Sequence, residues 1–188
     1  MDVSVDDFWA PRSSFLPPIE ELATAADLLD LAADALLAGK RDVARRIIAA
    51  CDMPELSAYR SQIVEGEKPY IHRYRAIENA PPRIRGAKAR MPSRKVALEV
   101  FRRDGWRCRF CGIRILSLEA IKLLDDIFPD EVRWRMKPYR NRNVAFNVLA
   151  SSPDHILPHG RGGDNDLSNL VAACGSCQFG RMQYTLEE

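Results

Sequence analysis

The chain has 188 residues, a formal net charge of +2 and 46% hydrophobic residues. This length allows one large domain or two small ones, and this composition can supply a buried core. No apolar run approaches the roughly 20 residues that cross a bilayer, and the acidic start of the chain lacks the basic and apolar regions of a secretory signal. The sequence therefore predicts a cytoplasmic protein with no membrane partner.

The first 66 residues are predicted to form an α-helical module. Apolar residues recur at spacings of three and four after Pro17-Pro18 and stop near Gly39, which is the pattern of an amphipathic helix. A second helical pattern covers residues 43–48, and a third begins at Pro54. Residues 1–66 offer no candidate catalytic group, so we expect them to serve in packing, partner contact or substrate placement.

Charge is distributed unevenly along the chain. Residues 1–66 carry 12 acidic and 6 basic side chains, whereas residues 73–109 carry 12 basic and 3 acidic ones. A basic stripe of this kind is what binding to a phosphate backbone requires. The alternative is a solvated linker whose charge offsets the acidic module. The candidate nucleic-acid contacts within the stripe are Arg83, Arg85, Lys88 and Arg90.

Residues 67–92 are interrupted by proline and glycine, which predicts a basic, Pro-rich linker. A second domain is expected over residues 93–188, beginning with a helix that Ser93 caps and Asp104-Gly105 ends. It holds an insert at about residues 113–150, where a helix is expected to close at Pro129. Three aromatic side chains are expected to anchor the insert: Trp134, Tyr139 and Phe146.

Two Cys-x-x-Cys pairs, Cys108/Cys111 and Cys174/Cys177, stand 62 residues apart. Four thiolates from two tight turns can bind zinc tetrahedrally, and such a site contributes roughly 10 to 16 kcal/mol to folding in small peptides. The alternatives are a redox pair or two disulfides, but a reducing compartment favours the metal. Cys51 lies in a helical pattern far from both pairs and is expected to be a small buried apolar residue.

The cysteine pairs bracket a group of motifs that together resemble an HNH endonuclease of the ββα-metal fold. The resemblance covers roughly residues 93–183 and is carried by these segments: 102–112, 153–158, 160–163, 169–171 and 174–177. It implies an α+β fold in which the α-helical module precedes a zinc-stapled ββα-metal domain. It also implies a metal-dependent endonuclease that hydrolyses DNA phosphodiester bonds. Its biological setting stays open among restriction, phage defence and mobile-element biology.

The resemblance assigns a role to each residue of the catalytic segment. His155 corresponds to the general base, and a positioned imidazole typically accelerates such a reaction 10²- to 10⁴-fold. Asp154 corresponds to a metal ligand, and Asn169 to the asparagine that braces the loop between the strands. Gln178 stands where many members have asparagine or histidine as a second metal ligand, so His159 is an alternative ligand. Adjacent residues of a strand point to opposite faces, so Asp154 and His155 can meet only through a local bend or the metal.

Ions and partners follow from the same resemblance. Zinc is expected at the cysteines and magnesium or manganese at the oxygen ligands, while a histidine ligand would also admit nickel or zinc. Arg161 and Arg181 correspond to phosphate contacts on DNA, with double-stranded DNA favoured. Cleavage of both strands would favour a homodimer. Two other functions remain open: a non-catalytic zinc module that binds nucleic acid, and a partner-binding adaptor built on the N-terminal helices.

Overall fold

The computed structural model describes residue 14, residues 16–64 and residues 91–186. The predicted linker therefore lies almost wholly outside the described residues. The same is true of four predicted nucleic-acid contacts: Arg83, Arg85, Lys88 and Arg90.

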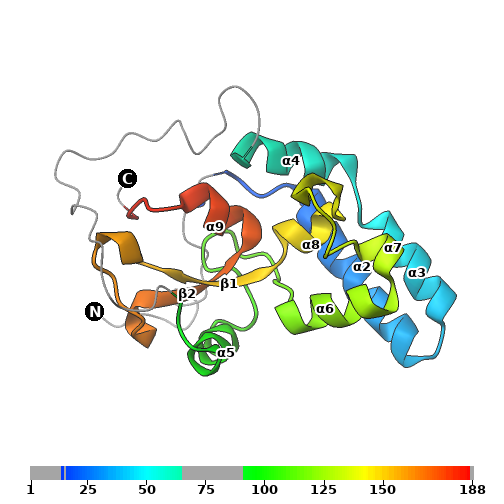
Figure 1. The fold of residues 1–188 in the computed structure, drawn as a ribbon, viewed down its shortest axis with the longest axis horizontal. Coiled ribbons are helices and arrows are strands. Elements are labelled where there is room, and N and C mark those ends of the chain that lie inside the picture. The colour runs from blue at the N-terminus through cyan, green and yellow to red at the C-terminus, as the bar shows by residue number, and fades with distance from the viewer. Residues whose placement is uncertain (1–13, 15, 65–90, 187–188) are drawn as a thin grey trace.

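Three helices form the N-terminal part, as the sequence predicts: α2 (Glu20–Leu37), α3 (Arg41–Ala50) and α4 (Pro54–Val64). Helices α2 and α3 pack along each other (Figure 1) and are joined through Gly39, whose φ of +72° suits glycine. In the described part of the chain, no helix combines the length and apolar character needed to span a membrane.

Helix α5 (Arg94–Arg103) confirms the predicted cap, because the Ser93 hydroxyl accepts a hydrogen bond from the Val96 amide at 3.3 Å. The helix ends at Asp104, whose side chain is 1% exposed. Its carboxylate accepts from Arg103 Nε at 2.8 Å and from the Ala172 amide at 2.7 Å. This carboxylate therefore fastens the end of α5 to the sheet.

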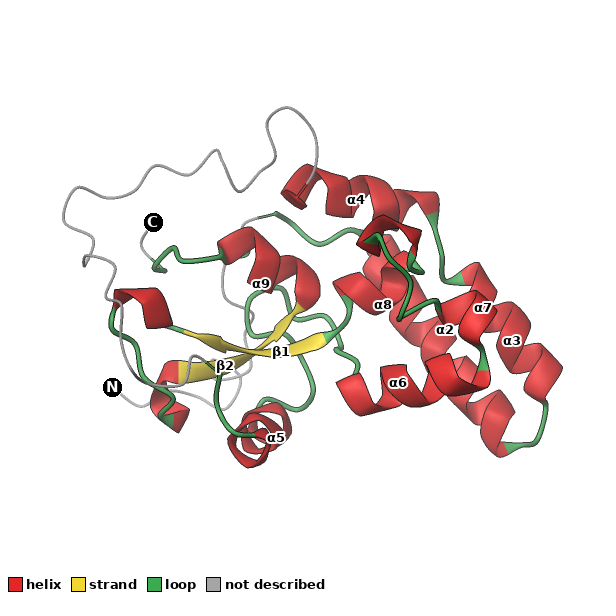
Figure 2. Ribbon diagram, in the orientation of Figure 1, coloured by secondary structure: helices red, strands yellow, loops and turns green. Residues whose placement is uncertain are grey.

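The described strands, β1 (Ser151–His155) and β2 (Leu170–Cys174), pair antiparallel with Asp154 opposite Val171 and His155 opposite Leu170. Helix α9 (Gly175–Arg181) follows β2 directly, and the strands lie between α5 and α9 (Figure 2). All five residues of β2 are buried, in a core shared with α5 and the first cysteine pair. The loop between the strands contains two 3-10 turns, η3 (His159–Arg161) and η4 (Leu167–Asn169).

The insert consists of α6 (Leu118–Ile127), α7 (Pro129–Val132), η2 (Tyr139–Asn141) and α8 (Val144–Val148). It packs with α2, α3 and α4 into one core separate from that of the strands, and these helices group together in Figure 1. We call this group of helices the helical body.

Buried polar contacts join the insert to the N-terminal helices as well. The Asn143 side chain donates to the Ile48 carbonyl at 3.1 Å, and the Val144 amide donates to Asp52 at 3.0 Å. Phe146 is fully buried, as an anchor should be, but the prediction for Tyr139 was wrong because this ring is 58% exposed.

Candidate active site and metal centre

The four thiols of the two cysteine pairs converge. Their sulfur atoms all lie within 4.8 Å of one another, and the sulfurs of Cys111 and Cys174 are 3.8 Å apart. Tetrahedral zinc with bonds of 2.3 Å requires sulfur separations of about 3.8 Å, whereas a disulfide requires about 2.05 Å. The set can therefore bind a metal ion such as zinc, as the spacing predicts. Cys51 is also as predicted: it is fully buried in the helical body, and this burial raises its pKa to about 12.

Backbone geometry shapes both cysteine turns. Gly112 has a φ of +78° and donates its amide to the Cys108 carbonyl at 2.8 Å. Cys174 caps α9, because its sulfur accepts from the Cys177 amide at 3.4 Å. A side chain at Gly175 would place its Cβ 2.0 Å from the Asn147 carbonyl oxygen, so the second turn fits closely against the helical body.

Asp154 and His155 face one pocket although they are neighbours on β1. Both are buried, at 8% and 7% exposure, and both line a pocket of about 30 Å³ together with His159 and Gln178. The His155 amide donates to Asp154 Oδ1 at 3.0 Å. The pocket has room for roughly two water molecules or an ion. The structure thus brings into one pocket four of the five residues to which the resemblance assigns a role, and Asn169 is not among the residues that line it.

A loop residue orients His155. The His155 Nε2 atom lies 2.9 Å from Asn165 Oδ1, and the His159 ring packs edge-on with its centroid 5.8 Å away. In the tautomer that donates to this amide oxygen, Nε2 carries the proton and Nδ1 holds the lone pair that can accept one. Asn165 was not among the site residues predicted from the sequence, because its contact with His155 depends on the path of the loop between the strands.

Asn169 ties the same loop to β2. Its side chain accepts from the Leu157 amide at 2.8 Å and donates to the Leu157 carbonyl at 3.2 Å and the Asp164 carbonyl at 2.9 Å. A Cβ at Gly163 would come within 1.8 Å of the Leu157 carbonyl oxygen and 2.8 Å of the Asn169 amide nitrogen. The close contact of these segments therefore requires glycine at position 163.

Residues 146–178 match the HNH endonuclease family model. The match contains both strands, the Asp154-His155 pair, Asn169 and the second cysteine pair. The C-terminal part of this chain contains an HNH domain. The comparison with curated proteins gave no match to the chain, and the comparison with solved structures gave none either.

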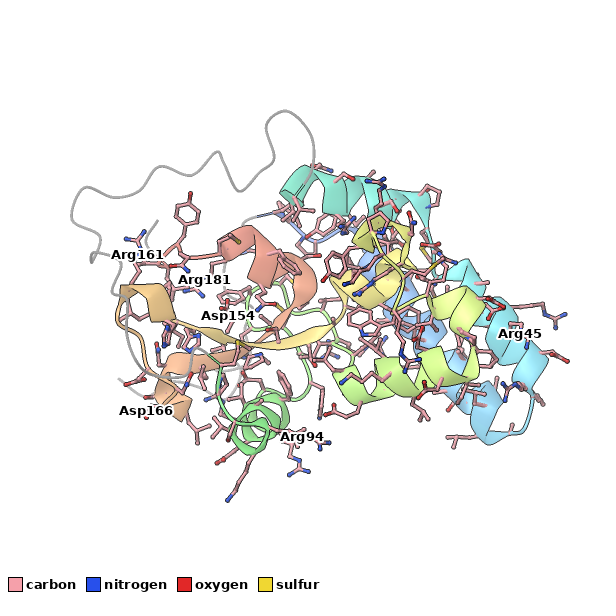
Figure 3. All side chains as sticks on the ribbon, viewed as in Figure 1. Arg45, Arg94, Asp154, Arg161, Asp166 and Arg181 are labelled. Atoms are coloured by element: carbon pink, nitrogen blue, oxygen red, sulfur yellow. The ribbon has the colours of Figure 1, made fainter. Side chains whose placement is uncertain are left out.

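Arg181 is part of the interior of the HNH domain. It is 0% exposed and donates through Nη1 to Asp154 Oδ2 at 2.9 Å; both residues are labelled in Figure 3. Nη1 also donates to the His155 carbonyl, and Nη2 donates to the Ile156 carbonyl. Its guanidinium also lies over the Phe110 ring, 5.4 Å from the centroid. The predicted phosphate contact would need this group to reach solvent. The structure instead uses it as counter-charge for a buried carboxylate.

The environment of Asp154 has two opposing effects on its pKa. Burial raises the pKa above its ordinary value, and the charge and hydrogen bond of Arg181 partly offset that rise. The net direction is upward. The site therefore disfavours the ionised form of the carboxyl group, because burial removes the water that would solvate it.

Basic side chains near the HNH site serve mainly in structure. Arg103 donates to the carbonyls of Leu167 and Leu170 at 2.7 and 2.6 Å, which ties α5 to the loop between the strands. Arg161 is half-buried and donates to the Gln183 carbonyl at 2.9 Å. The predicted role of Arg161 on DNA stays a prediction.

Proposed function

We propose that this chain is a metal-dependent endonuclease that hydrolyses phosphodiester bonds of double-stranded DNA. The observation that carries the proposal is the pocket where Asp154, His155, His159 and Gln178 meet inside a matched HNH domain. Metal-dependent hydrolysis of a phosphodiester needs a general base and a bound cation at the same phosphate. This pocket offers a side chain that can act as the base and side chains that can bind the cation.

His155 acts as the general base in this proposal. Asn165 holds the Nε2 side of the ring at 2.9 Å, which leaves Nδ1 to take a proton from the attacking water. Asn165 is then a positioning residue. Asn169 keeps the loop that carries Asn165 against the end of β1.

The donor set of the pocket fits a hard divalent cation. Asp154 uses one oxygen for Arg181 and the other for the His155 amide, and each carboxylate oxygen retains a further lone pair. Asp154 would hold the ion together with Gln178 or His159. Oxygen ligands suit magnesium or manganese, and an imidazole ligand also admits nickel or zinc. When bound, the ion would stabilise charge on the phosphoryl and leaving oxygens.

Plasmid nicking tests this function. Zinc-loaded protein is incubated with supercoiled plasmid and magnesium or manganese, and nicked circles are expected. His155→Ala should lower the rate at least about 100-fold, which is the lower limit for a positioned base. The chain has three histidines, and His72, outside the described residues and the matched segment, supplies the matched control His72→Ala. Undiminished nicking by His155→Ala would refute the role of this base.

The contact between Arg181 and Asp154 favours a second candidate, a zinc module that binds nucleic acid without cutting it. A cation on Asp154 must share the carboxylate with a guanidinium 2.9 Å away, and this repulsion lowers metal affinity. In that case the protein shifts the plasmid in a gel but leaves it supercoiled at every metal concentration. Under the endonuclease proposal, cleavage of both DNA strands would favour a homodimer, because one HNH site acts on one phosphate.

A further inference from the structure

A second pocket, of about 520 Å³, lies between the helical body and the HNH domain. It is bounded by the end of α4, the insert, the start of β1 and the first turn of α9. Its volume is in the range of small-molecule sites, roughly 300 to 1,000 Å³. The residues that matter for its chemistry are Trp134, Tyr139, Arg142, Ser151, Ser176 and Gln178.

One wall is a stack of planar groups. The Arg142 guanidinium lies 4.5 Å from the Trp134 ring centroid and 4.3 Å from the Tyr139 ring centroid. Tyr139 remains 58% exposed although it is aromatic and lines an apolar pocket. Nucleobases stack on aromatic rings and on guanidinium planes of this kind.

The pocket lining also includes two buried serines, Ser151 and Ser176, whose hydroxyls have unmet hydrogen-bonding capacity. Ser151 and Ser176 are 4% and 5% exposed, and their Oγ atoms have no hydrogen-bond partner among the described residues. Buried hydroxyls are ordinarily paired. Rotation about χ1 of either serine would present its hydroxyl to a ligand in the pocket, and nucleobases have donors and acceptors on their edges.

The larger pocket adjoins the catalytic pocket. Gln178 lines both of them. A ligand in the larger pocket that contacts Gln178 would therefore lie next to the pocket of Asp154 and His155.

We propose that this pocket receives a single nucleobase turned out of the DNA helix next to the phosphate that is cut. The inference rests on the proposed function in taking DNA as the ligand. The planar wall stacks on the base, and the two serine hydroxyls bond its edge. A base that is already unpaired costs less to turn out and should bind more tightly.

Binding of bulged duplexes to the full chain tests this directly. Fluorescein-labelled duplexes carry one extrahelical nucleotide, with each of the four bases in turn, and the reference duplex carries an abasic nucleotide at the same place. Anisotropy is measured on zinc-loaded protein without magnesium or manganese. At least one base should raise the affinity about tenfold or more over the abasic bulge.

Matched variants locate the effect. Tyr139→Ala and Arg142→Ala should abolish the preference for the base, whereas Tyr139→Phe, which keeps the ring, should retain it. Arg140→Ala removes the same charge as Arg142→Ala from an exposed neighbour that does not line the pocket, and should also retain it. Circular dichroism and zinc content confirm that each variant is folded.

The outcomes separate this inference from the proposed function. Equal affinity for all four bases and the abasic bulge overturns the inference, as does a preference that survives both Tyr139→Ala and Arg142→Ala. Failure to bind any duplex overturns it too. Base preference without plasmid nicking would sustain the pocket and reject the nuclease, and nicking without base preference would do the reverse.

Discussion

Replacing Arg181 with methionine keeps most of the side chain's length and leaves the Asp154 carboxylate buried without its counter-charge. The change also removes the bonds to the His155 and Ile156 carbonyls. Breaking one partner of a buried ion pair costs about 3 to 5 kcal/mol. Since whole domains are stable by about 5 to 15 kcal/mol, Arg181→Met should lower the free energy of unfolding by about 3 to 5 kcal/mol.

The loss of stability caused by Arg181→Met should be smaller when the unpaired charge on Asp154 is also removed. Adding Asp154→Asn to Arg181→Met leaves a neutral amide in place of the carboxylate, so the double variant should be more stable than Arg181→Met alone by about 1 to 3 kcal/mol. Low pH should have the same effect. Burial already raises the pKa of Asp154 from its ordinary 3.8, so the folded state keeps this proton to a higher pH than the unfolded chain. Stability is therefore lost as pH rises above that value, and more steeply without Arg181.

Urea unfolding of the zinc-loaded proteins measures these differences. Arg161→Met is the matched control, because it removes the same charge from a half-buried arginine whose Nε bonds a carbonyl in the same domain. It should cost less than Arg181→Met, because Arg161 is half-buried and solvent screens its charge. If Arg181→Met cost under about 1 kcal/mol, or if the double variant showed the sum of the two single effects, the argument from buried charge would be refuted.

Two further predictions concern the thiols and the loop. A chelator should make the four cysteines of the two pairs react with a thiol reagent. Cys51, whose pKa is raised to about 12 by burial, should react only after urea unfolding. Mass spectrometry of labelled peptides counts the reacted thiols, and reaction of all five at one rate would contradict this prediction. Asn169→Ala removes three hydrogen bonds to backbone groups, so it should cost about 2 to 4 kcal/mol and slow nicking. Asn169→Asp keeps the acceptor for the Leu157 amide and should lose less stability; equal losses in urea melts would count against the bracing role.

Local patterns in the sequence predicted most of the elements. The apolar spacing before Gly39 predicted α2, the serine at position 93 predicted the start of α5, and the cysteine spacing predicted the thiol cluster. Each of these features depends on residues close in the chain or on the chemistry of one ligand type. The domain limits suggested by the sequence stay a prediction.

Contacts between residues far apart in the sequence could not be predicted from local patterns. Arg181 was expected at a phosphate, but whether an arginine faces solvent or a buried carboxylate depends on Asp154, 27 residues away. Tyr139 was expected to anchor the insert, yet it contacts Arg142, lines a pocket and is 58% exposed. The role of Asn165 likewise follows only from the path of a glycine-rich loop.

The shared interior of the insert and the N-terminal helices has a consequence for how this protein could be cut or recombined. Trimming the chain to residues 91–188 would strip the cover from Ile121, Phe128 and Phe146, which are fully buried against those helices. Such a fragment would expose a hydrophobic surface and tend to self-associate. The HNH domain is therefore not separable from the N-terminal helices, and a folded graft into another protein would have to include residues 16–64.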